Sequence, residues 1–137
     1  MCENLSNDEV KLISEAYCLD FIDFAKQQYG VTLDYSVDSL KHAEGIAGHL
    51  HETMPPGVDE EQLFSFGKMI GSYLGEVFIR NHPAEWTMAE TPDGQSFPGI
   101  SIEAGGAIYP WVKARNRIAN GPEENLHHFY LAISEKI

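Results

Sequence analysis

The chain has 137 residues, of which 43% are hydrophobic and 11% aromatic, and its formal net charge is −12. This length suits one domain over residues 1–137 with a hydrophobic core of its own, and the composition excludes an intrinsically disordered chain. The acidic balance repels nucleic-acid backbones and anionic membrane surfaces, so we expect neither as a partner.

The first ten residues, MCENLSNDEV, are polar and acidic. They lack the basic start and the apolar run of a signal peptide, and no stretch approaches the roughly 18 consecutive apolar residues of a membrane-spanning helix. We therefore expect a cytoplasmic protein. The two cysteines, Cys2 and Cys18, fit neither a disulfide framework nor a zinc site, and Cys18 is expected to be a small core or helix-surface residue.

Two helices are predicted in the first part of the chain. The first spans residues 7–29, because Ser6 and Glu9 form a capping-box pattern and Gly30 is a typical helix stop. Its predicted inner face consists of Val10, Ile13, Tyr17, Phe21 and Phe24. After an extended link, a second helix is expected to begin at Ser36 or Asp38 and to end near residue 52. The sequence MPPG at 54–57 then breaks the chain.

The third predicted helix, residues 59–81, carries glycines at 67, 71 and 75. On a helical wheel at about 100° per residue, these glycines fall among hydrophobic residues on one half of the helix. Each glycine costs about 1 kcal/mol relative to alanine, so their alignment indicates a groove in which a neighbouring backbone or aromatic ring packs closely. The alternative is a groove for a ligand or a peptide. We expect this helix to be central.

Short β-prone runs follow at residues 86–90, 97–103 and 105–110, separated by the turn TPDGQS and by Ala-Gly-Gly. They predict a three-stranded antiparallel meander. A fourth helix is expected from Pro110 to Asn120, and a last one from Pro122 to about Ser134. The predicted fold is therefore α+β, with about five helices around a central glycine-rich helix and one small sheet.

Histidines crowd the second helix, where His42, His49 and Glu52 can share one face. Imidazole and carboxylate groups at such spacing can bind a divalent metal ion in a helix bundle, which makes a small metal-dependent hydrolase one hypothesis. The chain has no H-E-x-x-H sequence. The alternative interpretation is a set of partly exposed polar side chains.

Other catalytic motifs are missing from the sequence. It contains no G-x-S-x-G, no glycine-rich phosphate-binding loop and no C-x-x-C. Since nothing in the sequence points to nucleophilic chemistry or to a bound nucleotide, we expect no cofactor and favour a protein that is not an enzyme.

Two groups of residues are candidates for binding. Arg115 and Arg117 belong to the only basic cluster of the chain, which is expected to pair with the acidic N-terminal half or, alternatively, to bind an anion or a partner. Glu76 and Arg80 are spaced for a helical ion pair. Placed opposite the glycines, they could form a small surface site with Trp86, or a structural pair beside a buried tryptophan.

The segment GSYLGE at residues 71–76, followed by Arg80 and Trp86, resembles the G-x-Y-L-G-E-x-x-x-R signature and tryptophan strand of a family of small bacterial proteins of unknown function. LDYS at 33–36 resembles the start of the second helix of these proteins, and residues 120–130 resemble their C-terminal segment. The resemblance covers about residues 30–131. It implies a single intact domain and no particular activity.

The acidic charge is unevenly distributed, with 13 acidic and 3 basic residues in 1–61 and 8 and 6 in 62–137. This favours a non-catalytic binding protein with a basic protein partner, since opposite charge speeds association. An immunity-type inhibitor of a basic toxin would be one example. A homodimer is compatible with this hypothesis and with the hydrolase hypothesis, because the edges of a small sheet invite pairing.

Overall fold

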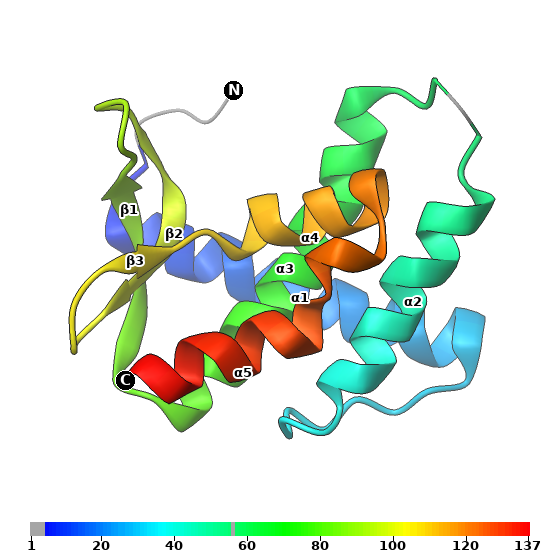
Figure 1. The fold of residues 1–137 in the computed structure, drawn as a ribbon, viewed down its shortest axis with the longest axis horizontal. Coiled ribbons are helices and arrows are strands. Elements are labelled where there is room, and N and C mark those ends of the chain that lie inside the picture. Colours follow the sequence, from blue (N-terminus) through cyan, green and yellow to red (C-terminus); the bar gives the residue numbers. More distant parts are fainter. Residues whose placement is uncertain (1–4, 56) are drawn as a thin grey trace.

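Five α-helices, one 3₁₀ turn and one three-stranded sheet make up the computed structural model, which describes residues 5–55 and 57–137 (Figure 1). The sheet lies at one side of the molecule and α2 at the other, with the remaining helices between them (Figure 1). The helical elements are α1 (Asn7–Tyr29), α2 (Leu40–Thr53), α3 (Glu60–Asn81), α4 (Pro110–Asn120), the 3₁₀ turn η1 (Pro122–Glu124) and α5 (Leu126–Lys136). The predicted α+β class is confirmed.

The strands β1 (Ala84–Glu90), β2 (Ser96–Ile102) and β3 (Ala107–Ile108) pair antiparallel in chain order, so the predicted meander is confirmed. Trp86 lies opposite Ile100, which in turn lies opposite Ile108, and this buried row faces the helices. The third strand is shorter than the predicted 105–110. Gly105 and Gly106 have positive φ values and form the preceding turn, and Pro110 already begins α4.

The ends of α1 match the sequence prediction. The Ser6 hydroxyl accepts a hydrogen bond from the Glu9 N–H, and the Glu9 carboxylate accepts one from the Ser6 N–H. Gly30 ends the helix with a left-handed φ of 67°. The buried face is rotated from the predicted stripe, because the fully buried positions are Val10, Ser14, Cys18, Phe21 and Ala25. Ile13, Tyr17 and Phe24 are half-buried at its edge.

Two other helix starts differ from prediction. The second helix begins at Leu40 because a turn precedes it. In this turn, the Asp34 carboxylate accepts hydrogen bonds from the N–H and the hydroxyl of Ser36, and the Ser36 hydroxyl accepts one from the N–H of Ser39. The last helix was expected from Pro122 but begins at Leu126 and extends to Lys136. Residues 122–124 form the 3₁₀ turn, and Asn125 has an extended ψ of 126° and caps α5 with its side chain.

Helix α3 is central, as predicted, since it packs against α1, α4, α5 and the sheet and every residue from 70 to 78 is buried. The glycine groove is filled by the protein itself. A Cβ atom at Gly71 would overlap the backbone of Pro110 and Trp111, and one at Gly75 would overlap the Trp86 ring. At Gly67 it would lie 2.8 Å from Cβ of Arg115. The glycines therefore serve close packing.

Within the described residues, no helix combines the length and the hydrophobicity needed to cross a membrane.

Candidate functional site

A pocket of about 380 Å³ opens between the first half of α1, the end of α3 and β1. Among the described residues that line it, the acidic side chains are Asp8, Glu15, Glu76 and Glu85, and Lys11 is the one basic residue. Asn7, Ile79, Ala84 and Trp86 complete the wall. We call this the acidic pocket. Four carboxylates against one ammonium group make it a place where a cation is attracted.

Glu76 is the buried carboxylate of the acidic pocket. It is 9% exposed, its Oε2 lies 2.8 Å from the indole Nε1 of Trp86, and its Oε1 lies 3.9 Å from Nε of Arg80. The structure thus brings together the three residues that the sequence grouped. Of the two interpretations of this group, the geometry corresponds to the pair beside a buried tryptophan, because β1 folds back over this end of α3 and covers Glu76 with Trp86.

The Arg80 guanidinium packs on an aromatic stack next to the acidic pocket. Its guanidinium carbon lies 3.6 Å from the centroid of the Tyr35 ring, and Tyr35 is stacked on Tyr73 with centroids 5.6 Å apart. Tyr35 has a left-handed φ of 66°, which its N–H supports by donating a hydrogen bond to the Tyr73 hydroxyl over 2.8 Å. The stack holds the positive charge of Arg80 beside Glu76 and away from the pocket lining.

Burial, which disfavours a charged group, raises the pKa of the Cys18 thiol to about 12. Burial, with the nearby Cys18 as a second cause, also raises the pKa of Tyr35 to about 12. At neutral pH both groups are therefore uncharged, and Cys18 is a core residue without thiolate reactivity.

Asn7 fixes the mouth of the acidic pocket. Its side-chain oxygen accepts hydrogen bonds from the Thr87 hydroxyl at 2.8 Å and from the Met88 N–H at 2.9 Å. These bonds tie the start of α1 to β1, so the two walls that carry Asp8 and Glu85 are held at a constant separation. The sequence alone does not distinguish Asp8, Glu15 or Glu85, because acidic residues on an exposed helix face or strand are ordinary. Only the docking of β1 on α1 distinguishes them.

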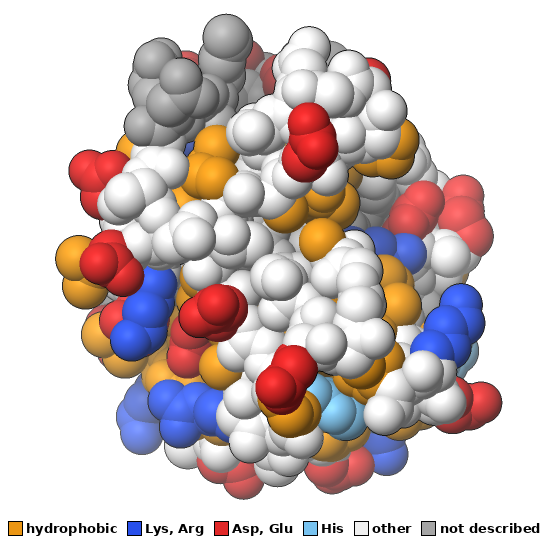
Figure 2. Space-filling model, turned by 90° about the vertical axis from the view of Figure 1, so that its left-hand side faces the viewer, with side chains coloured by type: hydrophobic (Ala, Val, Ile, Leu, Met, Phe, Trp, Pro, Cys, Tyr) orange, Lys and Arg blue, Asp and Glu red, His pale blue; other side chains and the backbone are white. Residues whose placement is uncertain are grey.

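The sheet extends the negative surface beyond the acidic pocket. No Lys or Arg occurs between residues 81 and 112, whereas Glu85, Glu90, Asp93 and Glu103 are exposed there. Figure 2 shows the corresponding face, on which acidic side chains lie among hydrophobic and uncharged ones, and Lys and Arg lie toward its edges.

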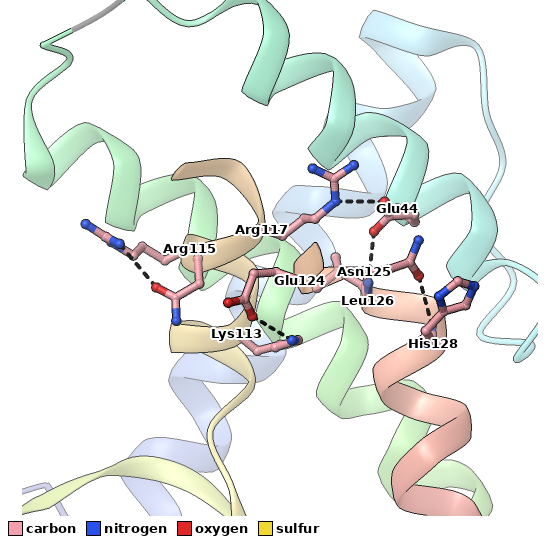
Figure 3. A network of polar contacts seen from close by, with 9 residues as sticks. Glu44, Lys113, Arg115, Arg117, Glu124, Asn125, Leu126 and His128 are labelled. Atoms are coloured by element: carbon pink, nitrogen blue, oxygen red, sulfur yellow. Dashed lines mark hydrogen bonds and ion pairs between the residues drawn. The ribbon is translucent and has the colours of Figure 1, made fainter. Parts of the chain in front are cut away.

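The predicted basic cluster is engaged in ion pairs within the chain. Arg117 is 6% exposed and its Nε lies 2.7 Å from Oε2 of Glu44, whose Oε1 accepts a bond from the Leu126 N–H (Figure 3). Arg115 binds both carboxylate oxygens of Glu60, at 3.0 and 2.5 Å. This pairing lowers the pKa of Glu60 through the hydrogen bond and raises that of Arg115. Arg115 and Arg117 thus pair with acidic residues of the N-terminal half.

The histidine cluster is not assembled. His42, His49 and Glu52 are exposed, and Nδ1 of His49 lies 2.7 Å from the hydroxyl of Tyr29. Within residues 5–55 and 57–137, no group of three or more His, Cys, Asp or Glu side chains is arranged to hold a metal ion. The spacing that places these side chains on one helix face does not supply a second element with further ligands.

No protein-family model, no curated protein and no solved structure matches the chain. The resemblance to the small bacterial family therefore remains a prediction, and the assignment of function relies on the geometry of the site.

Proposed function

We propose that this protein is a non-catalytic binding protein whose acidic pocket receives a lysine or arginine side chain of a basic protein partner. The observation that carries the proposal is the pocket lining, with four carboxylates, one ammonium group and the wall formed by Trp86. A guanidinium or ammonium group in this space would form charge-assisted hydrogen bonds with carboxylates. The nearby indole ring would pack against its aliphatic stem.

The wider surface supports a protein partner over a free small cation. The negative field extends from the acidic pocket across the sheet, which carries no Lys or Arg from residue 81 to 112. Such a field steers a basic protein toward the pocket and raises its association rate. An immunity-type inhibitor that captures a basic toxin in the cytoplasm would have this design. No observation favours the metal-dependent hydrolase, since His42, His49 and Glu52 do not converge.

The test uses a hexa-arginine peptide as the probe, titrated into the protein by calorimetry at low and at high NaCl concentration. We expect wild-type binding that weakens with salt, and a roughly tenfold loss in the triple variant Asp8→Asn, Glu15→Gln, Glu85→Gln, because rim charges govern steering. All three substitutions are at the pocket wall and preserve side-chain size.

The matched control removes the same charge elsewhere, with Asp23→Asn, Glu52→Gln and Glu61→Gln at exposed positions. We expect its affinity to stay within about twofold of wild type, because screening weakens charges that lie beyond about 10 Å. Equal losses in the two triple variants would show that the peptide senses only overall charge, and would overturn the assignment to the acidic pocket.

A further inference from the structure

Three aromatic side chains from three helices surround the ammonium group of Lys68. Its Nζ lies 5.8 Å from the ring centroid of Tyr17 in α1, 5.1 Å from that of Phe64 in α3 and 5.9 Å from that of Trp111 in α4. The Tyr17 and Trp111 rings are nearly perpendicular at 87°, and those of Phe64 and Trp111 meet at 74°. These rings form the walls of a box, which we call the Lys68 cage.

The walls of the Lys68 cage are held in place by the core. Trp111 is 2% exposed, and its Nε1 donates a 2.8 Å hydrogen bond to the hydroxyl of Ser72, which is fully buried. The Cα of Trp111 packs against Gly71 of α3. Phe97 of β2 supports the cage, with its ring 6.0 Å from Phe64 and 6.3 Å from Trp111. The Trp111 and Phe64 walls are therefore supported by contacts that do not involve the Lys68 side chain.

The side chain of Lys68 is held in the cage by aromatic contacts alone, as far as the described residues show. No carboxylate of these residues forms an ion pair with it, whereas Lys41 is paired with Asp38 and Lys113 with Glu124. Ordering a lysine side chain costs rotamer entropy, and a primary ammonium group is strongly hydrated. Lys68 is also half-buried, so its flexible stem can swing outward into solvent.

We propose that the Lys68 cage is a binding site for an organic cation with a quaternary ammonium head group, which replaces the Lys68 ammonium. A methylated ammonium ion carries the same charge as lysine but loses less hydration, and its methyl groups contact the ring faces directly. Rings within about 6 Å of a cation attract it electrostatically, and all three rings meet this condition for Nζ. Lys68 thus marks the position of the ligand's charge.

This site is independent of the proposed function. The acidic pocket contains Trp86 and the Lys68 cage contains Trp111, and these are the two tryptophans of the chain. Their indole N–H resonances in a proton–nitrogen NMR spectrum report on the two sites separately. Failure of one proposal can therefore be recognised without reference to the other.

The experiment titrates tetramethylammonium chloride into wild type and into Lys68→Ala while both indole resonances are followed. We expect the Trp111 resonance to shift in Lys68→Ala with an affinity about tenfold higher than in wild type, because the competing internal ammonium is gone. Any shift of the Trp86 resonance, caused by the cation in the acidic pocket, should have the same affinity in wild type and in Lys68→Ala. Lys113→Ala is the matched control, since Lys113 lies 5.1 Å from the Phe129 ring but has a carboxylate partner.

A second pair of variants tests the walls. In the Lys68→Ala background, Tyr17→Phe keeps the ring and should keep the affinity, whereas Tyr17→Leu should lose about fivefold or more. Comparison of choline with acetylated trimethyllysine distinguishes a free small molecule from a modified side chain as the source of the head group. The proposal is overturned if Trp111 does not shift in folded Lys68→Ala, if Trp86 shifts instead, or if Lys113→Ala gains affinity equally.

Discussion

The Glu76 carboxylate lies among the core residues of α3, and Trp86, which donates to it, is only 3% exposed. Burial of a carboxylate is costly unless hydrogen bonds or nearby cations compensate for the lost water. Trp86 provides the hydrogen bond and Arg80 the nearby cation. The dependence is mutual, because the indole N–H has Glu76 as its acceptor. At the scale of single residues, this pair positions both the base of the acidic pocket and its aromatic wall.

Replacement of Glu76 tests this dependence. We expect Glu76→Ala to lower the free energy of unfolding by about 2–3 kcal/mol, because the buried Trp86 N–H is left without an acceptor. Glu76→Gln keeps an oxygen in reach and should cost about 1 kcal/mol or less. Urea unfolding followed by tryptophan fluorescence measures both. If the two variants lost the same stability, the hydrogen bond would not be what holds Trp86 in place.

At the scale of elements, the crossing of α3 and α4 depends on small side chains. Gly67 and Gly71 face the backbone of α4, and Gly75 faces the sheet through Trp86 and Ile100. Glycine weakens an isolated helix, but here it lets two backbones approach and lets Pro110 begin α4 directly against α3. This close contact also fixes Trp111, and hence one wall of the Lys68 cage.

A methyl group at this crossing should be strongly unfavourable. We expect Gly71→Ala to destabilise the protein by about 1–3 kcal/mol or more, because the new Cβ meets backbone atoms that cannot move aside. Gly45→Ala is the control, since Gly45 is exposed in α2 with open space around it. That substitution should stabilise by about 0.5–1 kcal/mol. Thermal and urea unfolding compare them, and opposite signs are the expected result.

At the scale of the whole molecule, Glu44 joins the early and late parts of the chain. Its carboxylate in α2 binds Arg117 in α4 and the Leu126 N–H at the start of α5 (Figure 3). A carboxylate at a helix N-terminus is favoured by the helix dipole. The side chain of Arg117 is 7% exposed and that of its partner Glu44 is 15% exposed. In the second ion pair, the side chains of Arg115 and Glu60 are 28% and 63% exposed. Both pairs thus join an arginine to a glutamate, but the first is buried and the second is largely exposed.

Removal of the glutamate from each pair should lower the free energy of unfolding by different amounts. We expect Glu44→Ala to cost about 3–5 kcal/mol, since Arg117 becomes a buried charge without its partner. Glu60→Ala should cost at most about 1 kcal/mol because solvent screens the exposed pair. Circular dichroism during urea unfolding gives both values. Should Glu44→Ala prove too unstable, Glu44→Gln retains hydrogen bonding and should fall between the two. Equal costs for Glu44→Ala and Glu60→Ala would contradict the role of burial.

Local features of this protein can be predicted from the sequence because short-range chemistry decides them. The Ser6–Glu9 capping box, the stop at Gly30 and the glycine face of α3 each involve residues within a few positions of one another. The meander follows for the same reason, since turn residues separate its strands. At Ser36 and Asn125, hydrogen bonds from side chains stabilise a turn or a cap, so the helix that follows begins a few residues later than predicted.

The candidate sites were decided by tertiary structure. Glu76 is buried because β1 brings Trp86 onto it, and Asp8 becomes part of an acidic pocket only when α1 docks beside that strand. Likewise, Tyr17, Phe64 and Trp111 are separate hydrophobic residues in the sequence, and helix packing makes them one box around Lys68. The sequence by itself determined the elements, since hydrogen bonding and periodicity act locally. The sites needed the fold, because their electrostatics depend on distances between residues far apart in the chain.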